Sequence, residues 1–121
     1  CSADVPFEVF GRSGVHGVSF DLSLLSTSRY DAVGDYLESG GVAVLGVVPG
    51  TDPEKYPTWR DSAAPAVELM DRLGFPRRYL AERVAVSPTC GLSGASLPWA
   101  RHALTVLRDV RAAFTEDPDA L

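Results

Sequence analysis

A seven-residue apolar run, Val42–Val48, constrains the fold of this chain more than any other feature. The run reads VAVLGVV, is rich in β-branched residues, and shows no alternation of polar and apolar positions. A strand that is covered on both faces of a parallel sheet has this pattern. Helical patterns stand on both sides of the run, so it predicts an α/β protein in which parallel strands alternate with helices.

The rest of the chain divides into two further strands and several helices. The strands are expected over Val15–Leu22, with its end at Asp21, and near Arg83–Val86. Helices are expected over Asp4–Phe10, Ser28–Gly40, Thr58–Gly74 and Ser96–Phe114, with a further helical turn at Arg77–Leu80. Ser28, Thr58 and Ser96 are typical N-cap residues, and the glycines are typical stop signals. Pro65 is expected to kink its helix or delay its start.

Two architectures fit this order of elements. One is a small open doubly wound sheet, and the other is the C-terminal half of a (βα)8 barrel with the strand before Cys1 missing. The chain has 121 residues, the length of one ordinary domain. Because it begins with Cys1 rather than Met, we expect a processed start or a piece of a longer protein, with residues 1–121 forming one partial barrel domain.

The last expected helix carries a helical stripe of apolar residues, namely Leu97, Ala100, Leu104, Leu107 and Val110, which Phe114 extends. We expect this stripe to bury Leu104 and Leu107 against the sheet. Replacement of Leu104 by alanine should then lower the free energy of unfolding by about 2–5 kcal/mol. The acidic tail Thr115–Leu121 is expected to fray.

Charge and cysteine content exclude several classes of function. The 16 acidic and 11 basic residues give a net charge of -5, which argues against nucleic-acid binding. No apolar run approaches the ~20 residues of a membrane span. Two cysteines, Cys1 and Cys90, are too few for a disulfide scaffold, so a cytoplasmic protein is expected. One disulfide bridge, two free thiols or a shared metal ion remain open.

The carboxyl ends of the strands form the working face in either architecture. Cys1, Asp21, Pro49–Asp52 and Ser87–Leu92 all fall at that face. Two protein thiolates and a carboxylate form a reasonable zinc shell with an open position for a substrate thiol. The zinc ion would favour the thiolate form of that substrate. The alternative interpretation is that Cys90 is a small buried hydrophobic residue.

Other candidate residues have structural explanations. His16 is expected on the side away from the site, and His102 on a solvated helix surface. Trp59 and Trp99 are expected to pack helices against the sheet. The pair Arg77-Arg78 is expected to be exposed, and Ser93–Ser96 to form a turn and an N-cap rather than an anion site.

The segment Pro88-Thr89-Cys90-Gly91-Leu92 resembles the P-x-C-G-L turn of cobalamin-independent methionine synthases. The resemblance extends over most of the chain. The segment Cys1–Pro6 is similar to the region after the family's H-x-C motif, Val18–Asp21 to the next strand end, and Leu45–Pro49 to a strand of the form L-G-V-V. The chain resembles most the shorter, methionine-synthase-like branch of the family.

The resemblance implies a zinc-dependent methyltransferase that moves a methyl group from a methyltetrahydrofolate to homocysteine. Cys90 and Cys1 would be zinc ligands, and the family's glutamate would fall on or near Asp21 as a third ligand or an outer partner. The histidine of H-x-C would precede Cys1 and is not in this sequence. Thr89 stands where the longer enzymes of this family usually have aspartate.

Two other functions remain open at this stage. The chain could be a non-catalytic half-barrel or binding module that self-associates to cover its sheet edges, so a homo-oligomer is expected. It could also belong to another branch of the barrel superfamily, such as the uroporphyrinogen-decarboxylase-like proteins. Stoichiometric zinc in the purified protein would favour the methyltransferase.

Overall fold

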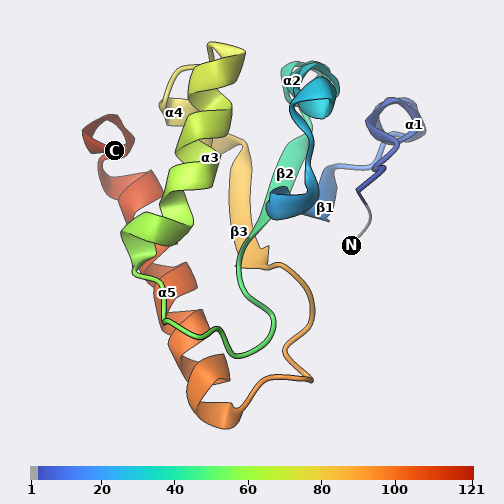
Figure 1. Cartoon of the computed structure of the whole chain (residues 1–121). Coiled ribbons are helices and arrows are strands. Elements are labelled where there is room, and N and C mark those ends of the chain that lie inside the picture. Colours follow the sequence, from blue (N-terminus) through green and yellow to red (C-terminus); the bar gives the residue numbers. More distant parts are fainter. Residues whose placement is uncertain (1–2) are drawn as a thin grey trace.

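The computed structural model describes residues 3–121 and contains a parallel three-stranded sheet (Figure 1). The strands are β1 (Gly17–Asp21), β2 (Val42–Val48) and β3 (Val84–Pro88), and their order in the sheet is their order in the chain. Consecutive parallel neighbours require a crossover helix between them. The structure therefore confirms an α/β fold with three parallel strands alternating with helices.

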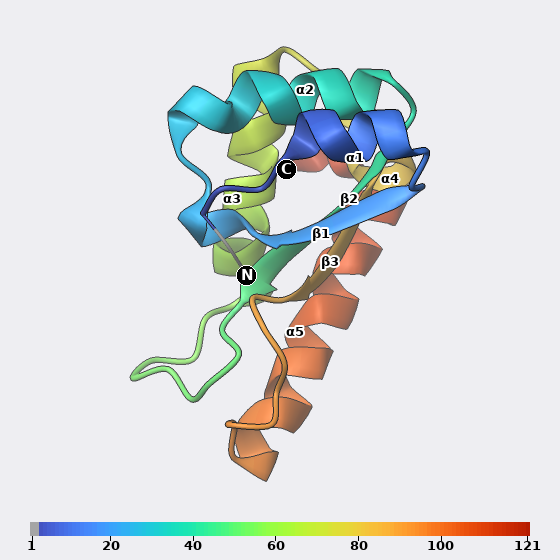
Figure 2. The same ribbon diagram turned by 90° about the vertical axis from the view of Figure 1, so that its right-hand side faces the viewer.

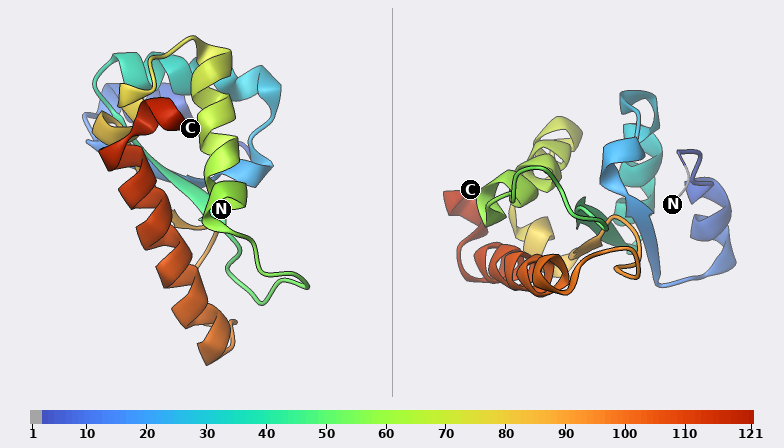
Figure 3. Two further views of the ribbon diagram at one scale, coloured as in Figure 1. Left: turned by 90° about the vertical axis from the view of Figure 1, so that its left-hand side faces the viewer. Right: turned by 60° about the horizontal axis from the view of Figure 1, so that its bottom comes forward.

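The α-helices of residues 3–121 are α1 (Phe7–Ser13), α2 (Tyr30–Glu38), α3 (Trp59–Leu73), α4 (Arg78–Glu82) and α5 (Leu97–Glu116). Three short 3-10 turns accompany them: η1 (Leu22–Leu24), η2 (Thr27–Arg29) and η3 (Pro118–Ala120). The helices follow one another around the sheet, from α1 on one side to α5 on the other (Figure 3, right). None of them is long and apolar enough to cross a bilayer.

Helices cover one face of the sheet and leave the other partly open. Along β1, Val18 and Phe20 are buried, whereas Gly17 and Ser19 are exposed. Phe7 of α1 meets Phe20 edge-on, with the ring centroids 5.1 Å apart. The alternation along β1 thus separates a face packed against helices from a face that faces away from them.

The register of the strands extends this division across the sheet. Phe20 pairs with Leu45 on the covered face, while Ser19, Val44 and Ala85 form one row on the open face. Val44 is half-buried and Ala85 is exposed. A doubly wound sheet carries helices on both faces, whereas a barrel carries them on its outer face alone. The arrangement is that of part of a (βα)8 barrel.

A capping box fixes the beginning of α3. The Thr58 backbone N–H donates to Asp61 Oδ2 at 2.8 Å, and the Asp61 N–H donates to Thr58 Oγ1 at 3.2 Å. The helix begins at Trp59 and continues past Pro65 to Leu73, so Pro65 does not delay its start, which was one of the two effects expected of it. The box satisfies the first backbone donors, and a buried face supports the helix, namely Ala63, Ala66, Leu69 and Met70.

The predicted apolar stripe of the last helix is correct at Leu107, Val110 and Phe114 but wrong at Leu97 and Leu104. Leu104 is 59% exposed and Leu97 is exposed as well. Trp99, Ala103 and Val106 complete the buried side, together with Leu107, Val110 and Phe114. Both sets have helical spacing, but the large apolar side chain of Trp99 turns its own side toward the sheet. The N-cap prediction is confirmed, because Ser96 Oγ accepts the Trp99 N–H at 3.3 Å.

Three smaller expectations are also corrected. Ser28 does not cap α2, because its Oγ bonds to Ser26 Oγ at 2.9 Å and a 3-10 turn precedes the helix. Arg77 is half-buried rather than solvated, and its guanidinium binds the Asp71 carboxylate at 2.9 Å. The same guanidinium donates to the backbone oxygen of Leu121, which ties the acidic tail to the body instead of leaving it frayed.

Candidate functional site

The strand ends approach one another around Gly46 in β2. A Cβ atom at this position would lie 2.8 Å from the Thr89 Cα and 3.2 Å from the Asp21 Cα. Cβ atoms do not come this close to backbone, so the approach of both neighbouring segments requires glycine. The pairing of β2 with β3 shifts between Gly46 and Val48. Such irregularities re-aim the residues that follow a strand and are common beside active sites.

Asp21 lies at the end of β1 and caps the turn η1. Its Oδ1 accepts the Ser23 N–H at 2.9 Å and the Ser23 hydroxyl at 2.6 Å. Both bonds fall on Oδ1, so Oδ2 is the oxygen left for a further ligand. The structure thus places Asp21 at the carboxyl edge of the sheet, as the sequence predicted.

The turn with Cys90 follows β3 and packs on the loop after β2. The Thr89 N–H donates to the Val48 carbonyl at 2.8 Å, and the Gly50 N–H donates to Thr89 Oγ1 at 3.2 Å. A Cβ on Gly50 would lie 3.4 Å from the backbone N and O of Cys90. Cys90 itself is an exposed free thiol, so the alternative of a buried hydrophobic cysteine is wrong.

A second link joins the same two loops farther from the sheet. The Ser96 backbone N–H donates to Asp52 Oδ1 at 2.7 Å, and the Ser96 hydroxyl donates to Oδ2. These two bonds lower the pKa of Asp52 below the ordinary value of an aspartate, the hydroxyl bond having the larger effect. Figure 2 shows both loops extending from the same end of the sheet. The link fixes the Cys90 segment against the loop after β2.

An aromatic cluster supports the base of these loops. Trp99 is fully buried and donates its indole N–H to the Pro49 carbonyl at 3.0 Å. Tyr56 contacts the Trp99 ring and the His102 ring, each with centroids 4.8 Å apart. The predicted packing role of Trp99 is confirmed. His102 is half-buried in this cluster and is not a solvated helix residue.

A cavity of about 320 Å³ lies beside the strand ends. Its lining comes from the end of β1, from η1, from the end of β2 and the loop after it, from α3, and from the segment after β3. The lining residues are Asp21, Leu22, Ser23, Gly46, Val47, Pro49, Pro65 and Thr89. The volume is at the lower end of the range for small-molecule sites. Asp21 supplies the ionisable side chain in this lining, and Cys90 lies next in sequence to Thr89.

The structure brings two of the predicted zinc ligands, Asp21 and Cys90, to one edge of the sheet. Within residues 3–121, no three His, Cys, Asp or Glu side chains come together in a way that could hold a metal ion. Cys1 lies outside the described residues. His16 lies just before the amino end of β1, at the opposite end of the strand from Asp21, as predicted. The ligand set of Cys90, Cys1 and Asp21 stays a prediction.

Three features of the site escaped sequence reasoning. The close approach at Gly46 and the contact between the Tyr56 and His102 rings depend on distant segments, which no local pattern encodes. The Asp52–Ser96 bond had a partial signal, because Asp52 was predicted at the working face and Ser96 at the start of the last helix. No sequence rule pairs these two residues.

Comparison with known families identifies the relatives of this chain. Residues 1–113 match the family described as cobalamin-independent synthase, catalytic domain. No curated protein and no solved structure matched the chain. The matched range includes all three strands, Asp21 and the Cys90 turn. The chain therefore belongs to the cobalamin-independent synthase family, of which it carries catalytic-domain sequence.

Proposed function

We propose that this chain contributes to a site of zinc-dependent methyl transfer, from a methyltetrahydrofolate to the thiol of homocysteine. Family membership supports zinc dependence, because the family is generally zinc-dependent. The observation that carries the proposal is the position of the Cys90 turn. Gly46 brings the Thr89 backbone and the end of β1 together, so Cys90 follows directly on a segment that approaches Asp21.

The chemistry of the predicted ligands fits zinc. A catalytic zinc ion commonly has three protein ligands and one open position, and its ligands are thiolates, imidazoles and carboxylates. The exposed Cys90 thiol and Asp21 Oδ2 supply two such donors, and Cys1 would supply the third. When bound, zinc stabilises a substrate thiol as the thiolate. The protein's own part is to hold the donors in position.

The loops beside the site have a positioning role in this proposal. Thr89 joins the Cys90 turn to Gly50 through its hydroxyl, and Asp52 joins the following segment to the loop after β2. These bonds reduce the conformational freedom of the Cys90 thiol, which lowers the entropic cost of metal binding. The cavity of about 320 Å³ beside Asp21 is the space we assign to the small thiol acceptor.

Zinc content tests the proposal directly. We would measure bound zinc in the purified chain and in a longer protein that carries the complete barrel, each compared with its Cys90→Ser variant. Cys90→Ser should lose zinc and thiol methylation in the complete barrel while circular dichroism stays unchanged. Ser93→Ala, an exposed replacement in the same loop, is the matched control and should keep both. Full zinc occupancy in Cys90→Ser would make Cys90 structural and refute the proposal.

One observation favours a second function, that of a non-catalytic binding module. The open face of the sheet presents Ser19, Val44 and Ala85, which are not fully covered in the structure. A module of this kind would use this face to bind another copy of the chain. Absence of zinc from the complete barrel, together with stable self-association, would favour it over the methyltransferase.

A further inference from the structure

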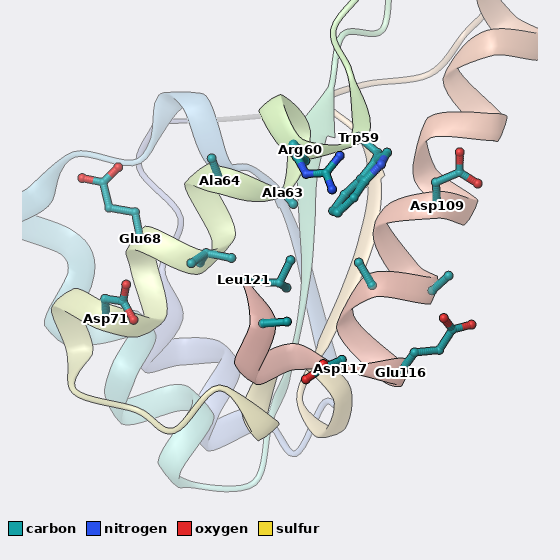
Figure 4. A pocket seen from close by; sticks show the side chains of 14 residues that line it. Trp59, Arg60, Ala63, Ala64, Glu68, Asp71, Asp109, Glu116, Asp117 and Leu121 are labelled. Atoms are coloured by element: carbon teal, nitrogen blue, oxygen red, sulfur yellow. The ribbon is translucent and has the colours of Figure 1, made fainter.

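A groove of about 810 Å³ lies on the outer surface of the molecule, between α3 and the second half of α5 (Figure 4). It is separate from the strand ends, and none of its lining residues belongs to the proposed zinc site. Its apolar lining consists mainly of small side chains: Ala63, Ala64, Val67, Ala112, Ala113, Ala120 and Leu121. At one end of the groove, the Arg60 guanidinium lies over the Trp59 ring, 4.3 Å from the ring centroid.

Carboxylates surround this apolar lining. Glu68 and Asp71 come from α3, Asp109 and Glu116 from α5, and Asp117 from the start of η3. Arg60 is the cation among the groove's lining residues within the described part of the chain. The groove therefore combines apolar surface with an edge of five carboxylates.

Neighbouring arginines neutralise part of this edge, but not all of it. Glu68 pairs with Arg72 at 2.8 Å, and Asp109 pairs with Arg108 at 3.1 Å. No ion pair within residues 3–121 involves Glu116. These two ion pairs are largely exposed to solvent, where such pairs contribute little.

The tail of the chain holds one end of the groove in shape. Arg77 binds the Asp71 carboxylate through two nitrogens, at 2.9 and 3.0 Å, and donates to the Leu121 carbonyl. This places η3 between α3 and α5, as Figure 4 shows for Leu121 and Asp117. The family match ends at residue 113, so Glu116, Asp117 and Leu121 lie beyond it. The groove depends on residues outside the matched family sequence.

The distribution of polar groups favours a helix over a small molecule as the occupant. Small-molecule sites converge a few buried polar groups on one point to fix the ligand's orientation. Here the carboxylates are spread along two helices, with Glu68 and Asp71 on α3 and Asp109 and Glu116 on α5. Alanine side chains between two helices allow the backbone of a third helix to approach closely. Basic residues on both sides of its apolar face would meet the carboxylates.

We propose that this groove is the docking site for a basic amphipathic helix of a partner protein. The apolar face of that helix would lie on the alanines, and its Lys or Arg residues would pair with Glu116 and the other carboxylates of the edge. This is the helix-in-groove mode of peptide recognition. The proposal is independent of methyl transfer, because it uses no residue of the strand ends.

A pair of synthetic peptides tests the docking site on the full chain. One peptide of about 18 residues, about five helical turns, carries Leu and Ala on one face and Lys on both flanks. The control peptide has Glu in place of each Lys. Fluorescence anisotropy should show at least about tenfold weaker binding of the acidic peptide. Raising salt from about 0.1 M to about 1 M shortens the screening length from about 10 Å to about 3 Å and should weaken the basic peptide's binding.

Two variants locate the binding on the molecule. Glu116→Lys should weaken binding of the basic peptide about five- to tenfold, because an attraction becomes a repulsion. Its matched control is Glu38→Lys, since Glu38 is the exposed last residue of α2, as Glu116 is of α5. Ala64→Phe should block the groove, whereas Leu104→Phe on the exposed side of α5 should not.

Several results would overturn the proposal. Equal binding of the acidic and basic peptides, or equal effects of Glu116→Lys and Glu38→Lys, would remove the role of charge. An alkylammonium ion that binds as tightly as the basic peptide would indicate a small-molecule site. Dissociation of a dimer by Ala64→Phe would indicate a self-interface. Circular dichroism checks that every variant is folded.

Discussion

Gly46 is the single residue on which the geometry of the strand ends most directly depends. An alanine there would bring its Cβ to 2.8 Å from the Thr89 Cα, a backbone atom that cannot move without shifting the whole turn. We expect Gly46→Ala to lower the free energy of unfolding by about 1–3 kcal/mol, the usual cost of overpacking. Urea denaturation measures the change.

Gly91→Ala is the matched control for this substitution. Gly91 lies in the neighbouring turn, and a Cβ there would have no heavy atom within 4 Å. Its stability should stay within about 0.5 kcal/mol of the wild type, as for ordinary surface substitutions. If both variants lose the same stability, the close approach at Gly46 does not constrain the fold.

The carboxylate of Asp52 should make stability depend on pH. Its bonds to Ser96 lower its pKa in the folded chain, so the unfolded chain binds the proton more readily. The resulting stabilisation is present above the unfolded pKa of about 4 and is lost as pH falls through the lower folded value. The stability difference between wild type and Asp52→Asn should therefore shrink from about pH 7 to about pH 3.

Urea denaturation across this pH range checks the prediction, because other carboxyl groups contribute equally to both proteins. Glu54→Gln, at an exposed position in the same loop, is the control. It should leave the pH dependence of the wild type nearly unchanged. A constant difference between wild type and Asp52→Asn at all pH values would show that the bond to Ser96 does not form in solution.

Residue-scale prediction from sequence succeeded where the signal was local. Thr58 and Ser96 as N-caps and Asp21 at a strand end all follow from residue type and position in a local pattern. Arg77 and His102 were mispredicted because their partners lie far away in sequence or on another element. Residue type alone does not encode such partners.

At the scale of elements, helix α5 provides the sharpest test. Leu104 and Leu107 were both expected to be buried, yet Leu104 is 59% exposed and Leu107 is 9% exposed. Leu107→Ala should therefore lower the free energy of unfolding by about 2–5 kcal/mol. Leu104→Ala should change it by no more than about 0.5 kcal/mol. Both variants have the same change in helix propensity, so their comparison isolates burial.

Thermal or urea unfolding of the two leucine variants decides which side of α5 faces the sheet. Large losses for both Leu104→Ala and Leu107→Ala would restore the burial expected from sequence and contradict the structure. The error in that expectation has a physical cause. The helical period admits two overlapping apolar stripes in this sequence, and the packing of Trp99 selects between them.

At the scale of the whole molecule, the order of elements was the most predictable property. The apolar run Val42–Val48, flanked by helical patterns, predicted a parallel sheet with crossover helices, and the structure confirms it. The order of elements alone did not decide between a barrel part and a doubly wound sheet, whereas the family resemblance favoured the barrel part. The structure supports that choice, because Ser19, Val44 and Ala85 share a face that the helices leave partly open.

That open face leads to a prediction about self-association. In the described part of the chain, β1 and β3 each pair with β2 alone, so both outer edges of the sheet are unpaired. Unpaired edges and partly exposed apolar surface favour association between chains, and a stable dimer commonly buries about 1,200–2,000 Å². We expect the purified chain to form a homodimer or larger assembly through this face.

Sedimentation over a wide concentration range measures this association. Ala85→Lys places a charge at an exposed position in the row of Ser19 and Val44, and should raise the dissociation constant at least about tenfold. Val9→Lys, at an exposed apolar position on α1, is the control and should leave it unchanged. A wild-type chain that stays monomeric at all concentrations would contradict the prediction. Equal weakening by Ala85→Lys and Val9→Lys would place the interface elsewhere, because the two positions lie on different faces of the molecule.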